Sequence, residues 1–505
     1  MKTGDGERLT RRTAAGAGIL IGTRLVTRGI DFVALILLAR LLTPADFGLV
    51  AIAMTLVLIC EAVSDLPIAQ AVVRMPVIDQ DHLDTAFTVS VMRGGAIAAL
   101  LCLAAWPFAI LYNDVRLVGL VSALALAPAL RGICNPRFAI FARNLDFRRE
   151  TLVEVGTKLC SLTVAAGLAW TTRSYWAIAA GTIAGPLAMN LIAYAMAPWS
   201  PRFTLREWPA FTRFLGWASG GQVLNAISWQ VDQLALGRFV ARQELGLFTI
   251  ASTLAFLPFQ IVIQQISRPL VAGFAMVQDD PARQANAYQL GTATLVALCL
   301  PVIVGMSMLA GPLTMLALGP QWGETATVLR WLALATIPAL FVAPAGALAM
   351  AINRTDTGFR LSSLEFAVRL PLTCAAAMQA GVPGVIAARA TATLLITLYA
   401  MRLVRSMIGL SMRRQMLGSW RAMLSSIVMA AALHPLWPAG PLTAPPLLIA
   451  GGLMASAAWG ATVYVLSMLL LWRASGRPAG AEARLVAFGT AMVARLGPPQ
   501  ARPSA

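Results

Sequence analysis

Long apolar stretches alternate with short basic gaps along most of this chain. A transmembrane helix needs about 20 mostly apolar residues, and segments of this kind recur from near the N-terminus to about residue 472. The predicted spans are 15–39, 47–72, 85–111, 117–135, 150–170, 174–197, 214–237, 246–269, 287–310, 326–350, 359–380, 382–404, 419–437 and 446–472. The pattern predicts an all-α membrane protein with about fourteen transmembrane helices.

The composition agrees with this fold class. The chain has 505 residues, of which 58% are hydrophobic and 12% charged, and its mean hydropathy is +0.73. A soluble core of this length could not bury so much apolar surface. The net charge of +17 does not indicate nucleic acid, because the arginines cluster beside apolar segments, as they do in membrane proteins that contact anionic lipids.

The basic residues also predict an orientation. If the N-terminus is cytoplasmic, the cytoplasmic gaps and tails, together with the cytoplasmic ends of the spans, contain 27 Lys and Arg residues, and the outer gaps contain five. Cytoplasmic loops of membrane proteins carry this excess. We therefore expect a multi-pass protein of the bacterial cytoplasmic (inner) membrane with both termini in the cytoplasm.

A short internal repeat lies 198 residues apart. Residues 39–53 align with 237–251, and the match pairs Arg40 with Arg238, Asp46 with Glu244, and Gly48 with Gly246. A chance match is the alternative. A repeat displaced by six spans predicts two lobes of the same topology with a substrate site between them. The expected organisation is a cytoplasmic tail (1–14), an N-lobe with helices 1–6 (15–213), a C-lobe with helices 7–12 (214–404), two further helices (405–472) and a cytoplasmic tail (473–505).

Motifs around these positions resemble a known family. They are ThrProAlaAspPheGlyLeu at 43–49, ArgAsnLeuAspPheArgArg at 143–149, ValAspGlnLeuAlaLeuGlyArgPhe at 231–239 and GluLeuGlyLeuPhe at 244–248. Together they resemble the Wzx-type polysaccharide flippases of the multidrug/oligosaccharidyl-lipid/polysaccharide exporter superfamily, over about residues 15–410. The resemblance implies two lobes around a central cavity, and a protein that moves undecaprenyl-diphosphate-linked glycans from the cytoplasmic to the outer leaflet.

Charged and polar residues within the spans are the candidate site. Such residues are costly at membrane depth and usually face protein or a water-filled cavity. The first span carries two arginines and an acid on one helical face, where the arginines suit a diphosphate and the acid could hold one of them. A structural ion pair between packed helices is the alternative. The candidate substrate-binding residues are Arg24, Arg28 and Asp31 in the first span, Gln222, Asn225, Trp229 and Asp232 in the seventh, and Gln260, Gln264 and Arg268 in the eighth.

Three further pairs of charged residues are spaced one turn apart. Glu61 and Asp65 are like-charged, so one of them could stay protonated or bind a coupling cation; an ion pair between Asp65 and an arginine of another helix is the alternative. The opposite-charged residues Glu154 and Lys158, and likewise Glu365 and Arg369, are expected to pair with each other within one helix. The acidic residues near His82 are read as a solvated loop, and we expect no metal site.

These features predict a lipid-linked oligosaccharide flippase that works by alternating access, without cofactor or enzymatic activity. Its expected partners are the lipid-linked oligosaccharide, membrane lipids and polysaccharide polymerase machinery, with no nucleic acid. A cation-coupled small-molecule exporter of the same superfamily is the alternative. A membrane glycan polymerase or ligase is less favoured, because no outer gap is long enough for a catalytic loop.

Overall fold

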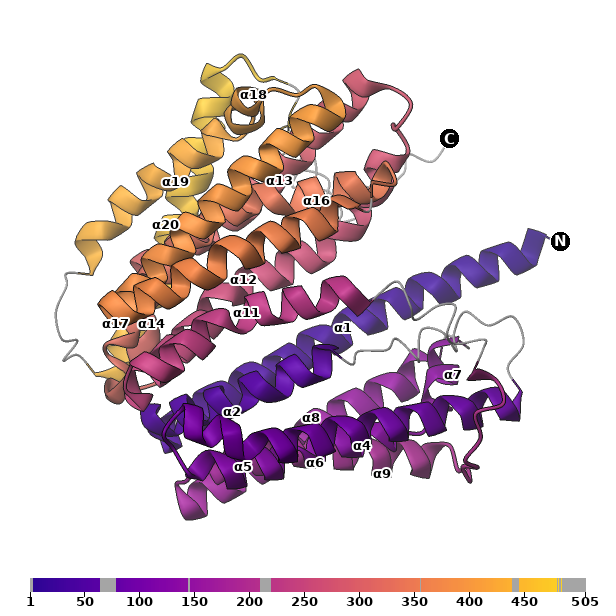
Figure 1. Cartoon of the computed structure of the whole chain (residues 1–505). Coiled ribbons are helices and arrows are strands. Elements are labelled where there is room, and N and C mark those ends of the chain that lie inside the picture. The colour runs from indigo at the N-terminus through magenta and orange to yellow at the C-terminus, as the bar shows by residue number, and fades with distance from the viewer. Residues whose placement is uncertain are drawn as a thin grey trace, which may run out of the picture. The chain divides into compact units, whose positions relative to one another are not determined.

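A computed structural model describes residues 3–63, 79–143, 146–208, 219–354, 356–437 and 445–478, together with residues 480 and 483. Every regular element in these ranges is a helix, as the apolar pattern predicted (Figure 1). The chain divides into two compact units: residues 1–249 with 373–382 form one, and residues 250–372 with 383–505 form the other. The boundaries predicted for the two lobes stay predictions.

The helices of the first unit follow the order of the first seven predicted spans. They are α1 (Thr3–Leu41), α2 (Pro44–Val63), α4 (Gln80–Leu111), α5 (Arg116–Leu124), α6 (Leu126–Gly132), α7 (Phe138–Arg143), α8 (Phe147–Thr172), α9 (Trp176–Met196), α11 (Ser219–Phe239) and the start of α12 (Arg242–Ala275). The predicted span 117–135 is thus built from two short helices, α5 and α6. Helix α8 packs along both α1 and α9, and α11 packs along α2.

The second unit contains the rest of α12 and the later helices, except residues 373–382 of α17, which belong to the first unit. The later helices are α13 (Pro281–Met308), α14 (Ala310–Ala317), η1 (Pro320–Trp322), α15 (Thr325–Ala335), η2 (Ile337–Phe341), α16 (Val342–Ala351), α17 (Asp356–Ile408), α18 (Met412–Leu417), α19 (Trp420–Leu433), η3 (His434–Leu436) and α20 (Pro446–Ala474). Helix α17 is interrupted at Gly381, whose φ of 56° and ψ of −134° are accessible mainly to glycine. This break separates the predicted spans 359–380 and 382–404.

Eight helices in the described residues are long and apolar enough to cross a membrane: α2, α4, α8, α9, α13, the α15–α16 segment, α17 and α20. Large apolar side chains along them are exposed. On α4, for example, Leu103, Trp106 and Ile110 are 77%, 62% and 61% exposed, and their spacing places them on one face of the helix. In water such a face would be costly, whereas lipid covers it. The protein is therefore a multi-pass, all-helical membrane protein, and the total of fourteen spans stays a prediction.

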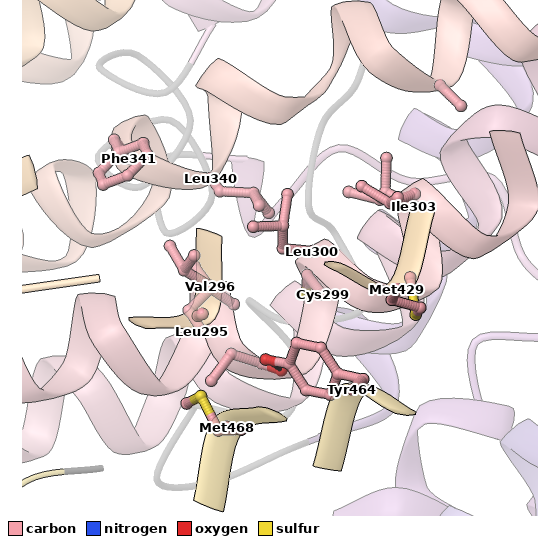
Figure 2. Packing of buried hydrophobic residues seen from close by; sticks show 14 of the residues in the cluster. Leu295, Val296, Cys299, Leu300, Ile303, Leu340, Phe341, Met429, Tyr464 and Met468 are labelled. Atoms are coloured by element: carbon pink, nitrogen blue, oxygen red, sulfur yellow. Dashed lines mark hydrogen bonds between the residues drawn. The ribbon is translucent and has the colours of Figure 1, made fainter. Parts of the chain in front are cut away.

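The core of the second unit forms where α13 meets α19 and α20. Figure 2 shows Tyr464 and Met468 of α20 beside Cys299 and neighbouring apolar residues of α13. The hydroxyl of Tyr464 donates a hydrogen bond of 2.9 Å to the carbonyl oxygen of Ala297, which satisfies a polar atom in this apolar setting. The residues after predicted span twelve thus contribute directly to the core of this unit.

The first unit is held at one end by a corner between α4, α5, α11 and α12. Arg242 donates hydrogen bonds to the carbonyl oxygens of Gly237 (2.6 Å) and Tyr112 (2.7 Å), and it lies 3.5 Å from the carboxylate of Asp114. The side chain of Arg116 binds the same carboxylate at 2.8 Å. The hydrogen bond from Arg116, with the nearby charge of Arg242, lowers the pKa of Asp114 below its usual range. Arg242 therefore joins three segments of the chain.

Candidate functional site

Two arginines on α1 keep exposed side chains. Arg24 and Arg28 lie one turn apart, and each is exposed, whereas the adjacent Thr23 is buried and its hydroxyl lies 2.5 Å from that of Thr151 on α8. One face of α1 is thus packed on α8 while the arginines lie on another. Among the described residues, no ion pair occupies either guanidinium, so both retain donors for an anionic ligand.

The acid of the first span forms an ion pair with another helix, which was the alternative expectation for this group. Asp31 accepts a hydrogen bond of 2.6 Å from Lys158 of α8 and does not pair with Arg28. The expectation that Asp31 holds Arg28 is therefore wrong, and so is the expected self-neutralising pair of Lys158 with Glu154. The reason is the packing of α8 along α1, which brings the ammonium and the carboxylate together across two helices.

Glu61 of α2 also pairs with another helix. Its carboxylate forms an ion pair with Arg131 in the last turn of α6. From the sequence, the charged residue expected beside Glu61 was Asp65, one turn further along. Asp65 lies outside the described residues, so its partner stays a prediction. The ion pair gives the Glu61 carboxylate a cationic partner on α6, and a role of Glu61 in ion coupling stays a prediction.

A cavity of about 480 Å³ adjoins this ion pair. Three helices supply its lining: α2, α4 and α6. The polar lining groups are Glu61, Arg131, Arg93 and Ser90, and the remaining lining residues are Leu58, Ala62, Gly94, Ile97, Pro128 and Gly132. Arg93 and Arg131 were not among the site residues predicted from the sequence. The sequence feature that could have indicated this cavity is Arg93, because an arginine in the interior of a predicted span usually faces protein or water.

The polar stripe predicted for the seventh span lies on α11. Trp229 is 45% exposed and Asp232 only 3% exposed, so these two residues differ in environment. The side chains of Gln222 and Asn225 lie outside the described part of the chain. Next to Asp232, Gln233 accepts a hydrogen bond of 2.9 Å from Thr55 of α2. That contact joins α11 to α2; a role of the stripe in substrate binding stays a prediction.

Three polar residues of the eighth span were predicted to bind substrate, and the structure describes the side chain of one of them, which lies in the second unit. Gln260 is partly buried, and the side chains of Gln264 and Arg268 lie outside the described part. One turn before Gln260, the ring of Phe256 lies 4.3 Å from the guanidinium carbon of Arg389, a cation–π contact. The predicted self-neutralising pair of Glu365 and Arg369 is present on α17 at 3.2 Å.

The acidic segment around His82 is the N-terminal part of α4 and not a solvated loop. Asp84 is buried and accepts a hydrogen bond from the backbone N–H of Arg202. The hydroxyl of Thr88 accepts another from Thr204. The segment that follows α9 therefore docks on α4. No metal-binding group of His, Cys, Asp or Glu occurs among the described residues.

Comparisons with known proteins identify the family. The model of a family described as "Polysaccharide biosynthesis protein" matches residues 37–327. The succinoglycan biosynthesis transport protein ExoT of Rhizobium meliloti is 25% identical over 61% of this chain, and the match covers 63% of ExoT, slightly under two thirds of its length. The lipopolysaccharide biosynthesis protein WzxC of Escherichia coli is 22% identical over 82% of this chain and 85% of WzxC.

Solved structures share the fold. The lipid II flippase MurJ in an inward closed conformation superimposes with a TM-score of 0.71 at 13% identity, over 92% of this chain and all of the MurJ chain. An inward-facing multidrug resistance MATE transporter gives a TM-score of 0.62 at 15% identity, over 75% of this chain and 94% of its own. The chain therefore belongs to the polysaccharide biosynthesis protein family, as its resemblance to Wzx-type flippases predicted, and has the helical membrane fold seen in MurJ and MATE transporters.

Proposed function

We propose that the protein moves a diphosphate-linked lipid oligosaccharide across the bacterial cytoplasmic membrane by alternating access, without cofactor or enzymatic chemistry. The family and the named relatives, which are transport and biosynthesis proteins of surface polysaccharides, support a substrate of this class. The observation that carries the proposal is the exposed pair Arg24 and Arg28 on α1. Two guanidinium groups one helical turn apart suit the two phosphates of such a lipid carrier.

The other predicted residues complete this proposal. The polar groups of α11 and α12, which include Trp229, Asp232 and Gln260, would contact the glycan, while the lipid tail stays in the bilayer. Export is favoured physically because moving one negative charge out of a negative-inside cell releases about 2.3 kcal/mol per 100 mV. A polysaccharide polymerase would receive the product at the outer face.

The arginine pair can be tested in cells that depend on this protein for surface glycan. We expect Arg24→Ala and Arg28→Ala each to abolish export while the protein accumulates normally in the membrane. The corresponding Lys variants should retain part of the activity, since they keep the charge but lose the planar, two-donor geometry. Arg360→Ala is the matched control: Arg360 is also an exposed arginine of a helix, and it pairs locally with Asp356.

Full export by both alanine variants would overturn the diphosphate role of α1. The proposed orientation has a separate test, in which single cysteines near either terminus are labelled with an impermeant reagent in intact cells. Both should be protected unless the membrane is opened. Labelling of either one in intact cells would contradict the placement of the termini in the cytoplasm.

A further inference from the structure

We propose that the cavity between α2, α4 and α6 is a phosphate-binding site, separate from Arg24 and Arg28, and that its occupant is the headgroup of an anionic phospholipid. Free phosphate is the other source of the same chemistry. Among the described residues, those that line this cavity belong to α2, α4 and α6 and not to α1. The inference does not depend on which glycan the protein moves.

The paired arginine of the cavity has unused hydrogen-bond donors. Among the described residues, Arg131 makes one side-chain contact, from Nη1 to Oε1 of Glu61. Its Nη2 and Nε are therefore available to a ligand, and the side chain is 48% exposed. A guanidinium can bind a phosphate through two parallel N–H donors, and the second arginine of the lining, Arg93, adds positive charge to the same cavity.

The position of the charged groups along their helices fits a headgroup. Glu61 lies in the last turn of α2, and Arg131 lies in the last turn of α6. Helix ends of membrane spans lie near the level of the lipid phosphates. Basic pockets between transmembrane helices bind phospholipid headgroups in this way. Leu58, one turn before Glu61, is 40% exposed and offers an apolar contact for an acyl chain.

The wall of the cavity is formed by two helices in backbone contact. A side chain on Gly94 of α4 would lie 2.6 Å from the carbonyl oxygen of Pro128, and one on Gly132 of α6 would lie 2.7 Å from the carbonyl oxygen of Ser90. These glycines let α4 and α6 approach closely beside the cavity. The polar side chains of the lining are therefore carried on closely packed helices, which is the arrangement that a defined binding site needs.

The test uses the full-length protein purified in a non-ionic detergent. Native mass spectrometry follows the retention of added phosphatidylglycerol, with diacylglycerol of the same acyl chains as the comparator without phosphate. We expect retention of phosphatidylglycerol over diacylglycerol. Arg131→Ala should weaken that retention about tenfold, the scale of losing a hydrogen bond to a charged group. Arg360→Ala is the matched control and should bind like the unmodified protein.

Two further variants separate binding from folding. Arg131→Lys keeps the ion pair with Glu61 but loses the second donor, so phosphatidylglycerol retention should fall in a folded protein. Glu61→Gln should bind at least as tightly as the unmodified protein, because the carboxylate no longer competes for Arg131. Equal retention of the lipid by Arg131→Ala and Arg131→Lys and by the unmodified protein would overturn the site. A loss in Glu61→Gln as large as that in Arg131→Ala would also overturn it, since the ion pair would then be only structural.

The source of the phosphate is decided by competition. Sodium phosphate is titrated against bound phosphatidylglycerol at constant ionic strength. If the lipid stays bound, the headgroup is the occupant, as proposed. If phosphate displaces it from the unmodified protein at millimolar concentration, the site takes free phosphate, and the assignment to a lipid is wrong.

Discussion

Gly48 of α2 and Gly246 of α12 pack against each other in a reciprocal backbone contact. A side chain on Gly48 would overlap the carbonyl oxygen of Arg242, and one on Gly246 would overlap the carbonyl oxygen of Pro44. Each added Cβ would also lie 3.1 Å from the backbone nitrogen of the other glycine. Residues 44 and 48 are separated from 242 and 246 by the same 198 positions as the internal repeat. The two copies of the repeat therefore meet through equivalent atoms.

This contact predicts an unusual effect of adding one methyl group. Glycine to alanine normally stabilises a helix by about 1 kcal/mol, but Gly48→Ala and Gly246→Ala should each destabilise the protein by about 1–3 kcal/mol or more, because backbone atoms must move apart. Thermal unfolding of the detergent-solubilised protein measures the effect. Gly95→Ala on α4 is the matched control, since no atom lies within 4 Å of its added Cβ. Unfolding temperatures at or above that of the unmodified protein for both glycine variants would show that the contact is absent.

The corner around Asp114 predicts unequal roles for two arginines. Arg242 donates to two backbone carbonyl groups and is 19% exposed, whereas Arg116 is 57% exposed and binds only the carboxylate among the described residues. Arg242→Ala should lower the free energy of unfolding by about 2–3 kcal/mol, because buried carbonyl groups lose a charged donor. Arg116→Ala should cost less than about 1 kcal/mol. Chemical denaturation of the two variants side by side measures this; equal losses would mean that the backbone contacts of Arg242 contribute little.

The ion pair of Asp31 with Lys158 predicts non-additive effects between α1 and α8. Asp31→Asn and Lys158→Met should each reduce stability by up to about 1 kcal/mol, since both side chains are about 40% exposed. The double variant should lose no more than either single one, because the shared contact is already gone. Asp31→Lys combined with Lys158→Asp should recover part of the loss. If the losses instead add, Asp31 acts on another group, and the earlier idea that it holds Arg28 would return.

The docking of the segment after α9 predicts a local change in hydrogen exchange. The backbone N–H of Thr204 donates to the hydroxyl of Thr88, and Phe87 contacts the rings of Trp199 and Phe203. Thr88→Val removes the acceptor with little change in volume, so amide exchange in residues 199–207 should rise several-fold. Asp81→Ala is the control: its pair with Arg206 is exposed, and its loss should leave exchange of Thr204 unchanged. Unaltered exchange in Thr88→Val would show that the aromatic contacts alone hold the segment.

The spacing of residues along the chain predicted those features that depend only on residues close together in the sequence. The break between the spans 359–380 and 382–404 falls at Gly381, because a glycine between two apolar stretches can adopt the backbone angles of a turn. The pair of Glu365 and Arg369 forms because residues four apart on one helix meet whatever else surrounds them. Arg24 and Arg28 lie on the same side of α1 for a similar reason, since they are one turn apart.

The partners of the remaining charges depend on contacts between helices. By itself, the sequence determined the helical membrane fold, the order of the helices and the repeat, since these follow from hydrophobicity and from spacing along one chain. Only the tertiary structure decided that Asp31 meets Lys158, that Glu61 meets Arg131 beside a cavity, and that Gly48 meets Gly246. A partner of opposite sign stabilises an embedded charge, and the packing of α8 on α1 and the approach of α6 to α2 determine which one is within reach.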